Sequence, residues 1–170
     1  MSLQLFNDIV RPKAEARFLG VEMDQRLNFS KHIAEVCSRA NKRLAVLRFL
    51  ARAGTKPEVT IKLYKVYVRS LFESGSVAFV SAPKYQLDKL QKIQNEAIRC
   101  CLRLPSYISI RLLHESSGLP MLRDRLKTLN LSLYAKMIGR NQCIRDLRTE
   151  TEDANSTYVG NLRSPLDLIL

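Results

Sequence analysis

Apolar residues recur at helical spacing in four segments of this 170-residue chain, and most of these segments are bounded by glycine or proline. The clearest stripe runs from Ile33 to Ala51 and ends before Gly54. Comparable stripes occupy residues 57–72, 87–101 and 122–137, and a shorter helix is predicted near 108–115, before Gly118. Because such stripes are stable only when neighbouring helices cover them, the sequence predicts a mainly α fold, a bundle of about five helices.

Local signals indicate where these helices begin. Ser30 is in position to cap the first helix. Thr55 and Glu58 have the spacing of a capping box, and Pro57 suits the first turn of the second helix. Apolar residues cover most of the circumference of this second helix, so it is predicted to be central to the core. Residues 75–83 read as a turn and loop.

The two ends of the chain differ from the helical region. Residues 17–23 form a short apolar segment with partial alternation, which is typical of a strand. We therefore divide the chain into four parts. These are an N-terminal extension (1–13), a short strand or hairpin (14–29), a helical domain (30–139) and a polar tail (140–170) that is predicted to be flexible, with an apolar end.

Positive charge is concentrated on the predicted helices. The chain has 28 Lys and Arg against 16 Asp and Glu, a net charge of +12, and nucleic acid is the first candidate partner for so basic a protein. The first and third helices offer eight cations at separations suited to successive phosphates: Lys31, Arg39, Lys42, Arg43, Lys89, Lys92, Arg99 and Arg103. Arg48 and Arg52 flank the opposite edge of the first stripe. The alternative is that these are solvated basic faces with no ligand.

Several chemistries lack the residues they need. The seven aspartates include no adjacent pair of the kind that holds two metal ions in a polymerase or nuclease. Neither a phosphate-binding Gly-rich loop nor a G-x-S-x-G elbow is present. The four cysteines contain no C-x-x-C pair, so neither a zinc site nor a disulfide framework is predicted. Reduced thiols and the lack of a membrane-length apolar run favour a nuclear or cytoplasmic protein with no membrane partner.

Four single side chains carry predictions of their own. Gln94 lies in the middle of an apolar arc, so its amide is predicted to pin a loop or a neighbouring helix. His114 is either an acid/base partner of Glu115 or, as we favour, a structural histidine bonded to nearby backbone. His32, in the first turn of a helix, is predicted to be exposed. Cys101 is predicted to be a small buried hydrophobe.

Five short motifs occur in the order found in the reverse transcriptases of non-LTR retrotransposons, and they cover about residues 14–138. They are residues 18–21 (F-L-G-V), 24–33 (D-Q-R-L-N-F-S-K-H-I), 63–65 with 72–76 (L-Y-K and F-E-S-G-S), 90–99 (L-Q-K-I-Q-N-E-A-I-R), and 113–115 with 118–120 (L-H-E and G-L-P). The chain thus resembles the region that follows the catalytic palm in the jockey-like branch of this family. Ser74 stands where the family motif usually has tyrosine.

This resemblance implies a primer-grip hairpin followed by a helical thumb that holds template and primer. By residue-to-residue correspondence, Phe18, Leu19 and Gly20 would shape the turn that positions the primer 3′ end. The family's metal-binding aspartates lie in the palm, so the resemblance implies a non-catalytic fragment of an RNA-directed DNA polymerase without a cofactor of its own. Any Mg²⁺ would belong to the palm. The implied partner is an RNA/DNA hybrid or a DNA duplex.

Two other functions remain open at this point. The chain is alternatively a helical protein-interaction module, whose apolar surface meets a palm-containing polypeptide or a second copy of itself. It is also compatible with a retrotransposon remnant that has no function. An upstream coding sequence with an F-x-D-D motif would instead make it part of a longer active enzyme.

Overall fold

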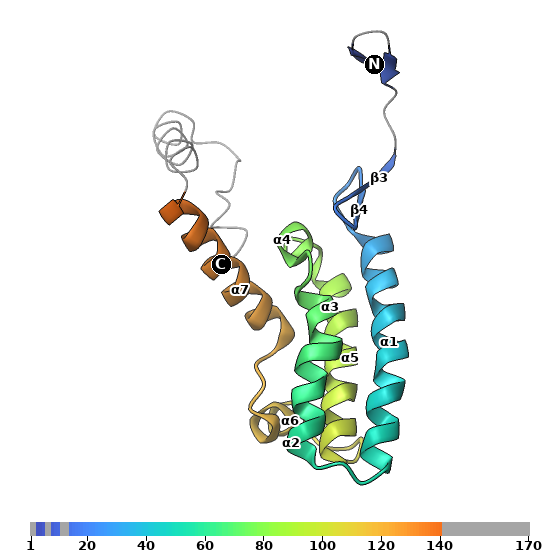
Figure 1. Cartoon of the computed structure of the whole chain (residues 1–170), viewed down its shortest axis with the longest axis vertical. Helices are drawn as coiled ribbons and strands as arrows, with labels where there is room; N and C mark the ends of the chain where they lie inside the picture. The colour runs from blue at the N-terminus through green and yellow to red at the C-terminus, as the bar shows by residue number, and fades with distance from the viewer. Residues whose placement is uncertain (1–2, 6–7, 11–13, 141–170) are drawn as a thin grey trace.

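The computed structural model describes residues 3–5, 8–10 and 14–140 (Figure 1). Two antiparallel hairpins come first, formed by strands β1 (Leu3–Leu5), β2 (Asp8–Val10), β3 (Glu15–Phe18) and β4 (Val21–Asp24). The helices are α1 (Ser30–Arg52), α2 (Pro57–Leu63), the π-helical segment η1 (Tyr64–Val68), α3 (Arg69–Glu73), α4 (Ser76–Phe79), α5 (Lys84–Leu102), α6 (Ile110–Ser117) and α7 (Leu122–Arg140). The prediction of a mainly α fold behind an N-terminal hairpin is confirmed. The predicted tail lies outside the described residues, apart from Arg140.

A hairpin replaces the single strand predicted over residues 17–23. Leu19 and Gly20 form its two-residue turn, and Phe18 pairs with Val21 across it. Both turn residues have positive φ, 47° and 85°, as the commonest tight hairpin turn requires. The hairpin alternative predicted for residues 14–29 is therefore confirmed. Leucine rarely adopts positive φ, so only Gly20 signalled a turn in the sequence. The β1–β2 hairpin was not predicted.

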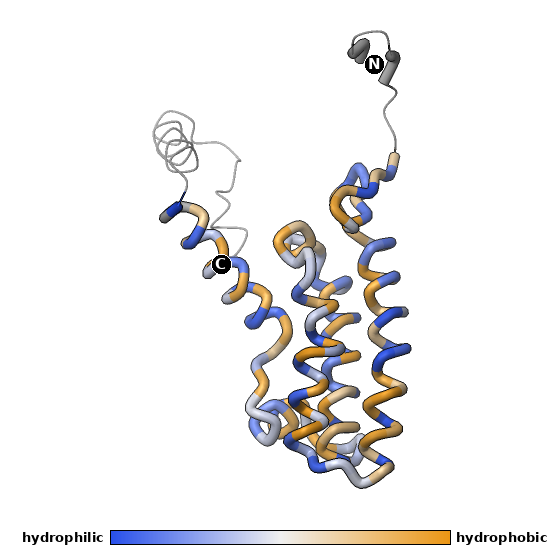
Figure 2. The backbone as a smooth tube through the Cα atoms, in the orientation of Figure 1, coloured by the Kyte–Doolittle hydropathy of each residue, from blue (hydrophilic) through white to orange (hydrophobic). Residues whose placement is uncertain are grey.

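The core lies between three long helical segments that run side by side: α1, the α2–η1–α3 run, and α5 (Figure 1). Along these helices each turn carries both apolar and polar residues, as the mixed orange and blue segments in Figure 2 show. Helix α5 is the central element, because it packs against α1, α2, α6 and α7. The helix predicted over residues 57–72 is also part of this core, as expected, and it packs against both α1 and α5. That helix buries Tyr64, Val68 and Phe72 but leaves Val66 largely exposed.

The second predicted helix is confirmed as one continuous helical run from Pro57 to Glu73, whose middle part is the π-helical segment η1. Both predicted side-chain caps are absent. Phe29, not Ser30, occupies the N-cap of α1, and the Ser30 hydroxyl instead accepts a hydrogen bond from the Gln86 amide at 2.5 Å. Lys56 is the N-cap of α2, with no side-chain cap. A tertiary contact has thus replaced a local one at Ser30.

Residues 75–83 are not only turn and loop, because they contain the short helix α4. Phe79 of α4 is fully buried and covers the first turn of α1, where its ring lies 5.3 Å from the His32 ring. Gly75 precedes α4 with φ 71°, and a Cβ atom placed there would lie 2.9 Å from Cγ2 of Val21. The β3–β4 hairpin is therefore seated directly on the backbone at Gly75.

Gln94 of α5 is buried and makes the contacts predicted from its sequence position. Its Oε1 accepts a hydrogen bond from the Tyr64 hydroxyl at 3.1 Å, and its Nε2 donates to the Pro120 carbonyl at 2.8 Å. The same region is tied by Gln91, whose Oε1 accepts from the Leu122 backbone N–H at 2.7 Å. The prediction that Gln94 pins a loop or a neighbouring helix is confirmed, and the structure shows that it pins both.

The structural role predicted for His114 is also confirmed. Its Nδ1 donates to the Leu119 carbonyl at 2.8 Å and closes the turn after α6, where Gly118 adopts φ 62°. Its Nε2 lies 3.0 Å from Oδ1 of Asn95. Cys101 is buried as predicted.

Only the first half of α7 is anchored to the bundle. Leu122 and Leu126 are buried. Farther along, the buried Asn130 side chain accepts from the Ser76 hydroxyl at 3.2 Å and donates to the Ser76 carbonyl at 3.4 Å. Beyond that point Leu133 is exposed, and the helix diverges from the bundle (Figure 1). The predicted apolar stripe of the last helix is therefore covered along only part of its length.

Candidate nucleic-acid interface

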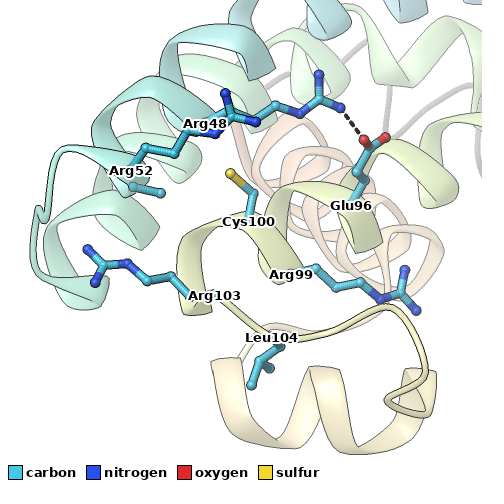
Figure 3. A pocket seen from close by; sticks show the side chains of 8 residues that line it. Arg48, Arg52, Glu96, Arg99, Cys100, Arg103 and Leu104 are labelled. Atoms are coloured by element: carbon cyan, nitrogen blue, oxygen red, sulfur yellow. Dashed lines mark hydrogen bonds and ion pairs between the residues drawn. The ribbon is translucent and has the colours of Figure 1, made fainter.

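A cleft of about 500 Å³ opens between the C-terminal halves of α1 and α5 (Figure 3). Both helices turn a basic edge toward it. Arg48 and Arg52 stand one helical turn apart on α1, and Arg99 and Arg103 stand one turn apart at the end of α5. The lining is completed by Ala51, Glu96, Cys100 and Leu104.

The four guanidinium groups differ in how far the protein satisfies them. Arg48 forms an ion pair with Glu96, drawn as the dashed line in Figure 3. Arg103 donates to the Thr55 carbonyl at 3.1 Å. Arg99 makes a long contact of 3.5 Å with the Ile108 carbonyl, and its Nε is buried without a partner. Arg52 makes no hydrogen bond or ion pair with the described residues.

The electrostatics of the cleft favour an anion. Its four arginines face one carboxylate, a formal excess of three positive charges, and guanidinium stays charged at any physiological pH. Burial raises the pKa of the Cys100 thiol, against the opposing effect of Arg48. The cysteine is therefore a neutral thiol at pH 7 and does not compensate the arginines. The cleft therefore keeps a net positive charge, because Arg48 is the one arginine of its lining that is paired with a carboxylate of the described residues.

The structure separates the eight cations that the sequence placed on the first and third helices. Arg99 and Arg103 line the cleft, and Lys89 and Lys92 lie exposed on the earlier turns of α5. Arg43 lies on the other side of α1, where it donates to the Tyr67 carbonyl at 2.5 Å with its guanidinium 4.7 Å above the Tyr67 ring.

The remaining three cations stand apart from the cleft. Lys31 pairs with Glu15 of β3 at 2.6 Å, which raises the pKa of the lysine through that hydrogen bond. Arg39 pairs with Glu35 at 3.8 Å. Lys42 is exposed.

Arg48 and Arg52 are the cleft residues absent from the predicted set. Their position on the edge of the apolar stripe was visible in the sequence. The sequence did not show which helix would pack beside that edge. Arg48 and Arg52 are four residues apart, and so are Arg99 and Arg103. This common spacing is the signal that could have indicated that the two pairs line one cleft.

The primer-grip-like residues lie at the tip of the β3–β4 hairpin. Phe18 is 63% exposed and Leu19 is 89% exposed, which leaves two large apolar side chains in solvent. Gly20 follows in the left-handed conformation.

Across the described ranges, no group of three or more His, Cys, Asp or Glu side chains is placed to hold a metal ion. No described helix combines the length and the hydropathy needed to cross a bilayer.

His32 is buried, which corrects the prediction that it is exposed. Its residual exposure is 3%, because α4 closes over the first turn of α1. Neither ring nitrogen has a hydrogen-bond partner within residues 3–5, 8–10 and 14–140. Burial, and then the positive charge of Arg39, lower the pKa of the imidazole below its usual 6.5. His32 is therefore a neutral ring at pH 7 with unmet hydrogen-bonding capacity.

This burial predicts a loss of stability in mild acid. Below pH 6.5 the unfolded chain takes up a proton at His32 before the folded chain does, so the free energy of unfolding falls as the pH is lowered. Arg39 and Arg17 reinforce the effect, whereas Glu35 and Glu22 oppose it. Urea unfolding at pH 7.5 and 5.5 measures the change. His32→Phe should show a smaller difference between the two pH values, and an unchanged difference would contradict the assignment.

The sequence is similar to three polymerases of Drosophila melanogaster mobile elements. It is 24% identical over 144 residues to the probable RNA-directed DNA polymerase from transposon BS, covering 84% of this chain and 16% of that protein. It is 26% identical over 163 residues to the probable RNA-directed DNA polymerase from transposon X-element, covering 95% and 18%. For the RNA-directed DNA polymerase from mobile element jockey, the identity is 24% over 144 residues, covering 83% and 16%.

No known family profile and no solved structure matches the chain. The chain spans less than a fifth of the length of each of the three relatives. The similarity nonetheless extends over more than four fifths of this chain and agrees with the ordered motifs at residues 18–120. These findings relate the chain to a segment of the reverse transcriptases of jockey-like non-LTR retrotransposons.

Proposed function

We propose that this chain is a non-catalytic reverse-transcriptase segment that binds template–primer duplex through the cleft between α1 and α5. The observation that carries the proposal is the convergence of four arginines from two helices on one cleft that holds a single carboxylate. Guanidinium groups bind phosphate oxygens in a bidentate manner, and contacts to phosphates carry no sequence information. Binding is therefore expected to be sequence-independent.

The other cations extend this surface in two directions. Lys89 and Lys92 continue it along the exposed face of α5. A second row of cations lies along α1, and a duplex contacts it only if it wraps around that helix. This row consists of Lys31, Arg39, Lys42 and Arg43. In the same arrangement the exposed turn at Phe18, Leu19 and Gly20 would lie toward the primer 3′ end, as the family resemblance implies. The partner is an RNA/DNA hybrid or a DNA duplex.

The salt dependence of binding tests the cleft. The wild-type chain should bind labelled hybrid or duplex in fluorescence anisotropy, with an affinity that falls steeply as salt increases. The double variant Arg52→Ala/Arg103→Ala should weaken binding and reduce the slope of log K against log salt by about two, because each lost phosphate contact removes roughly one unit.

A matched control and a third variant sharpen this test. Lys62→Ala/Lys65→Ala removes the same charge from exposed positions outside the proposed surface and should change the slope less. Arg39→Ala/Lys42→Ala/Arg43→Ala reports whether the second row takes part. Equal slopes for the cleft variant and its control would refute the cleft as the binding site.

The proposed lack of catalysis has a separate test. The seven aspartates of the sequence include no adjacent pair, and Mg²⁺ would be held by the family's palm. The purified chain should therefore add no nucleotides to a primed template in the presence of Mg²⁺. Incorporation that survives repurification of the chain would overturn this part of the proposal.

A protein-interaction module is the second candidate, favoured by exposed apolar residues. Val66 is 74% exposed and Phe49 is 70% exposed. A palm-containing polypeptide or a second copy of the chain would cover such residues. Light scattering at increasing concentration should show self-association if the second copy is the partner, and a monomer at all concentrations would count against it.

A further inference from the structure

A second cavity, of about 150 Å³, lies where the β3–β4 turn meets α1 and the end of α3. It is separate from the arginine cleft, with which it shares no residue. Its polar lining comes from three parts of the chain: Arg17 and Gly20 from the hairpin, His32 and Arg39 from α1, and Ser74 and Gly75 from the turn before α4. Its volume is well above the roughly 10 to 15 Å³ that a cavity needs to admit one water molecule.

His32 marks this cavity as a binding site. His32 is one of the residues that line the cavity, it is 97% buried, and neither of its ring nitrogens has a hydrogen-bond partner among the described residues. A buried polar atom without a partner costs about 1 to 3 kcal/mol. Buried nitrogens are therefore usually satisfied by protein, water or ligand, and the described protein residues supply nothing here.

The charges around His32 select the kind of ligand. Arg39 and Arg17 line the same cavity, and the positive charge of each lowers the pKa of the imidazole, while Glu35 and Glu22 raise it. Each arginine has a carboxylate nearby, but at long range: Nε of Arg17 is 3.7 Å from Glu22, and Nε of Arg39 is 3.8 Å from Glu35. At these distances the guanidinium donors are not saturated. Two arginines, a histidine and a serine thus line a space suited to a small oxyanion.

We propose that this cavity binds a phosphate group. The two guanidinium groups and a ring N–H of His32 would donate to the phosphate oxygens, and the negative charge would stabilise the protonated imidazole. The phosphate is either that of a free species, such as inorganic phosphate or a nucleotide, or one of a nucleic-acid backbone. This inference uses a different cavity from the cleft of the proposed function, and the two proposals share only Arg39, which also belongs to the second row of cations on α1.

The two histidines of the chain provide the measurement. In a histidine-labelled sample, NMR follows the ring resonances of His32 during titration with sodium phosphate, against sodium chloride at matched ionic strength. His114 is the internal reference, since its ring is bonded to Leu119 far from the cavity. We expect a saturable shift at His32 with phosphate only, and a higher titration midpoint of His32 in the presence of phosphate.

Two variants of equal charge change test the assignment. Arg39→Gln should weaken phosphate binding at least tenfold, and Arg52→Gln, in the other cleft, should leave it unchanged. Both positions are exposed, so neither variant threatens folding. The proposal is overturned if phosphate gives no saturation, if chloride gives the same shift, or if Arg39→Gln binds phosphate as the wild type does.

Further titrations identify the source of the phosphate. A nucleoside monophosphate that shifts His32 when a duplex does not supports a free species, whereas a shift with duplex supports a backbone phosphate. A response to neither compound would overturn the proposal. Arg52→Ala/Arg103→Ala separates the two sites, because it should weaken duplex binding while the response of His32 to inorganic phosphate persists.

Discussion

Replacing Gln94 with leucine is expected to lower the free energy of unfolding by about 3 kcal/mol, although leucine fills nearly the same space. The substitution removes the acceptor of the Tyr64 hydroxyl and the donor to the Pro120 carbonyl. Each buried group left without a partner costs about 1 to 3 kcal/mol. For a chain of this size, thermal unfolding followed by circular dichroism should show a decrease in Tm of roughly 6 to 12 °C.

A double-mutant cycle identifies the source of this loss. Tyr64→Phe removes only the hydroxyl, and combined with Gln94→Leu it deletes both members of one hydrogen bond. The double variant should therefore lose less stability than the sum of the two single variants. Additive losses, or a loss below about 1 kcal/mol for Gln94→Leu, would show that the amide is not the anchor we describe.

Gly75→Ala is expected to lower the free energy of unfolding by about 2 to 4 kcal/mol, for two separable reasons. A residue with a Cβ atom loses about 1 kcal/mol in the left-handed conformation that Gly75 adopts. The new methyl group would also lie 2.9 Å from Cγ2 of Val21, and overpacking of this kind costs about 1 to 3 kcal/mol. Urea unfolding measures the total.

Gly118→Ala is the matched control for this variant. Gly118 has a similar φ of 62°, but a Cβ atom there would meet nothing within 4 Å. The difference between the two alanine variants therefore reports the contact with Val21. Val21→Ala should recover part of the stability in the Gly75→Ala background. Equal losses at Gly75 and Gly118 would mean that the hairpin is not seated on this glycine.

Features encoded by spacing within one helix were predictable from the sequence. The arc that contains Gln94 already requires its amide to find partners, and the turn after Gly118 offers His114 a backbone carbonyl nearby. Helix positions followed for the same reason, since apolar periodicity and helix-stop residues are local signals.

Features that depend on contacts between distant segments were not predictable. His32 is buried only because Phe79, 47 residues later, packs over it. Ser30 loses its capping role to Gln86, 56 residues later. The candidate interface combines a predictable and an unpredictable feature. The basic edges of α1 and α5 are evident in the sequence. Which of these edges meet depends on how the two helices pack, so Arg48 joins the cleft and Arg43 does not.

Because α7 is anchored over only its first half, a small rotation there is amplified along the rest of the helix. Its last described tertiary hydrogen bonds are those of Asn130 with Ser76. From Asn130 to Arg140 the helix extends about 15 Å at 1.5 Å per residue. A rotation of a few degrees at the anchored end becomes a displacement of about an ångström at Arg140. The hydrogen bonds to Pro120 and Ser76 therefore determine the direction in which the second half of α7 extends from the bundle.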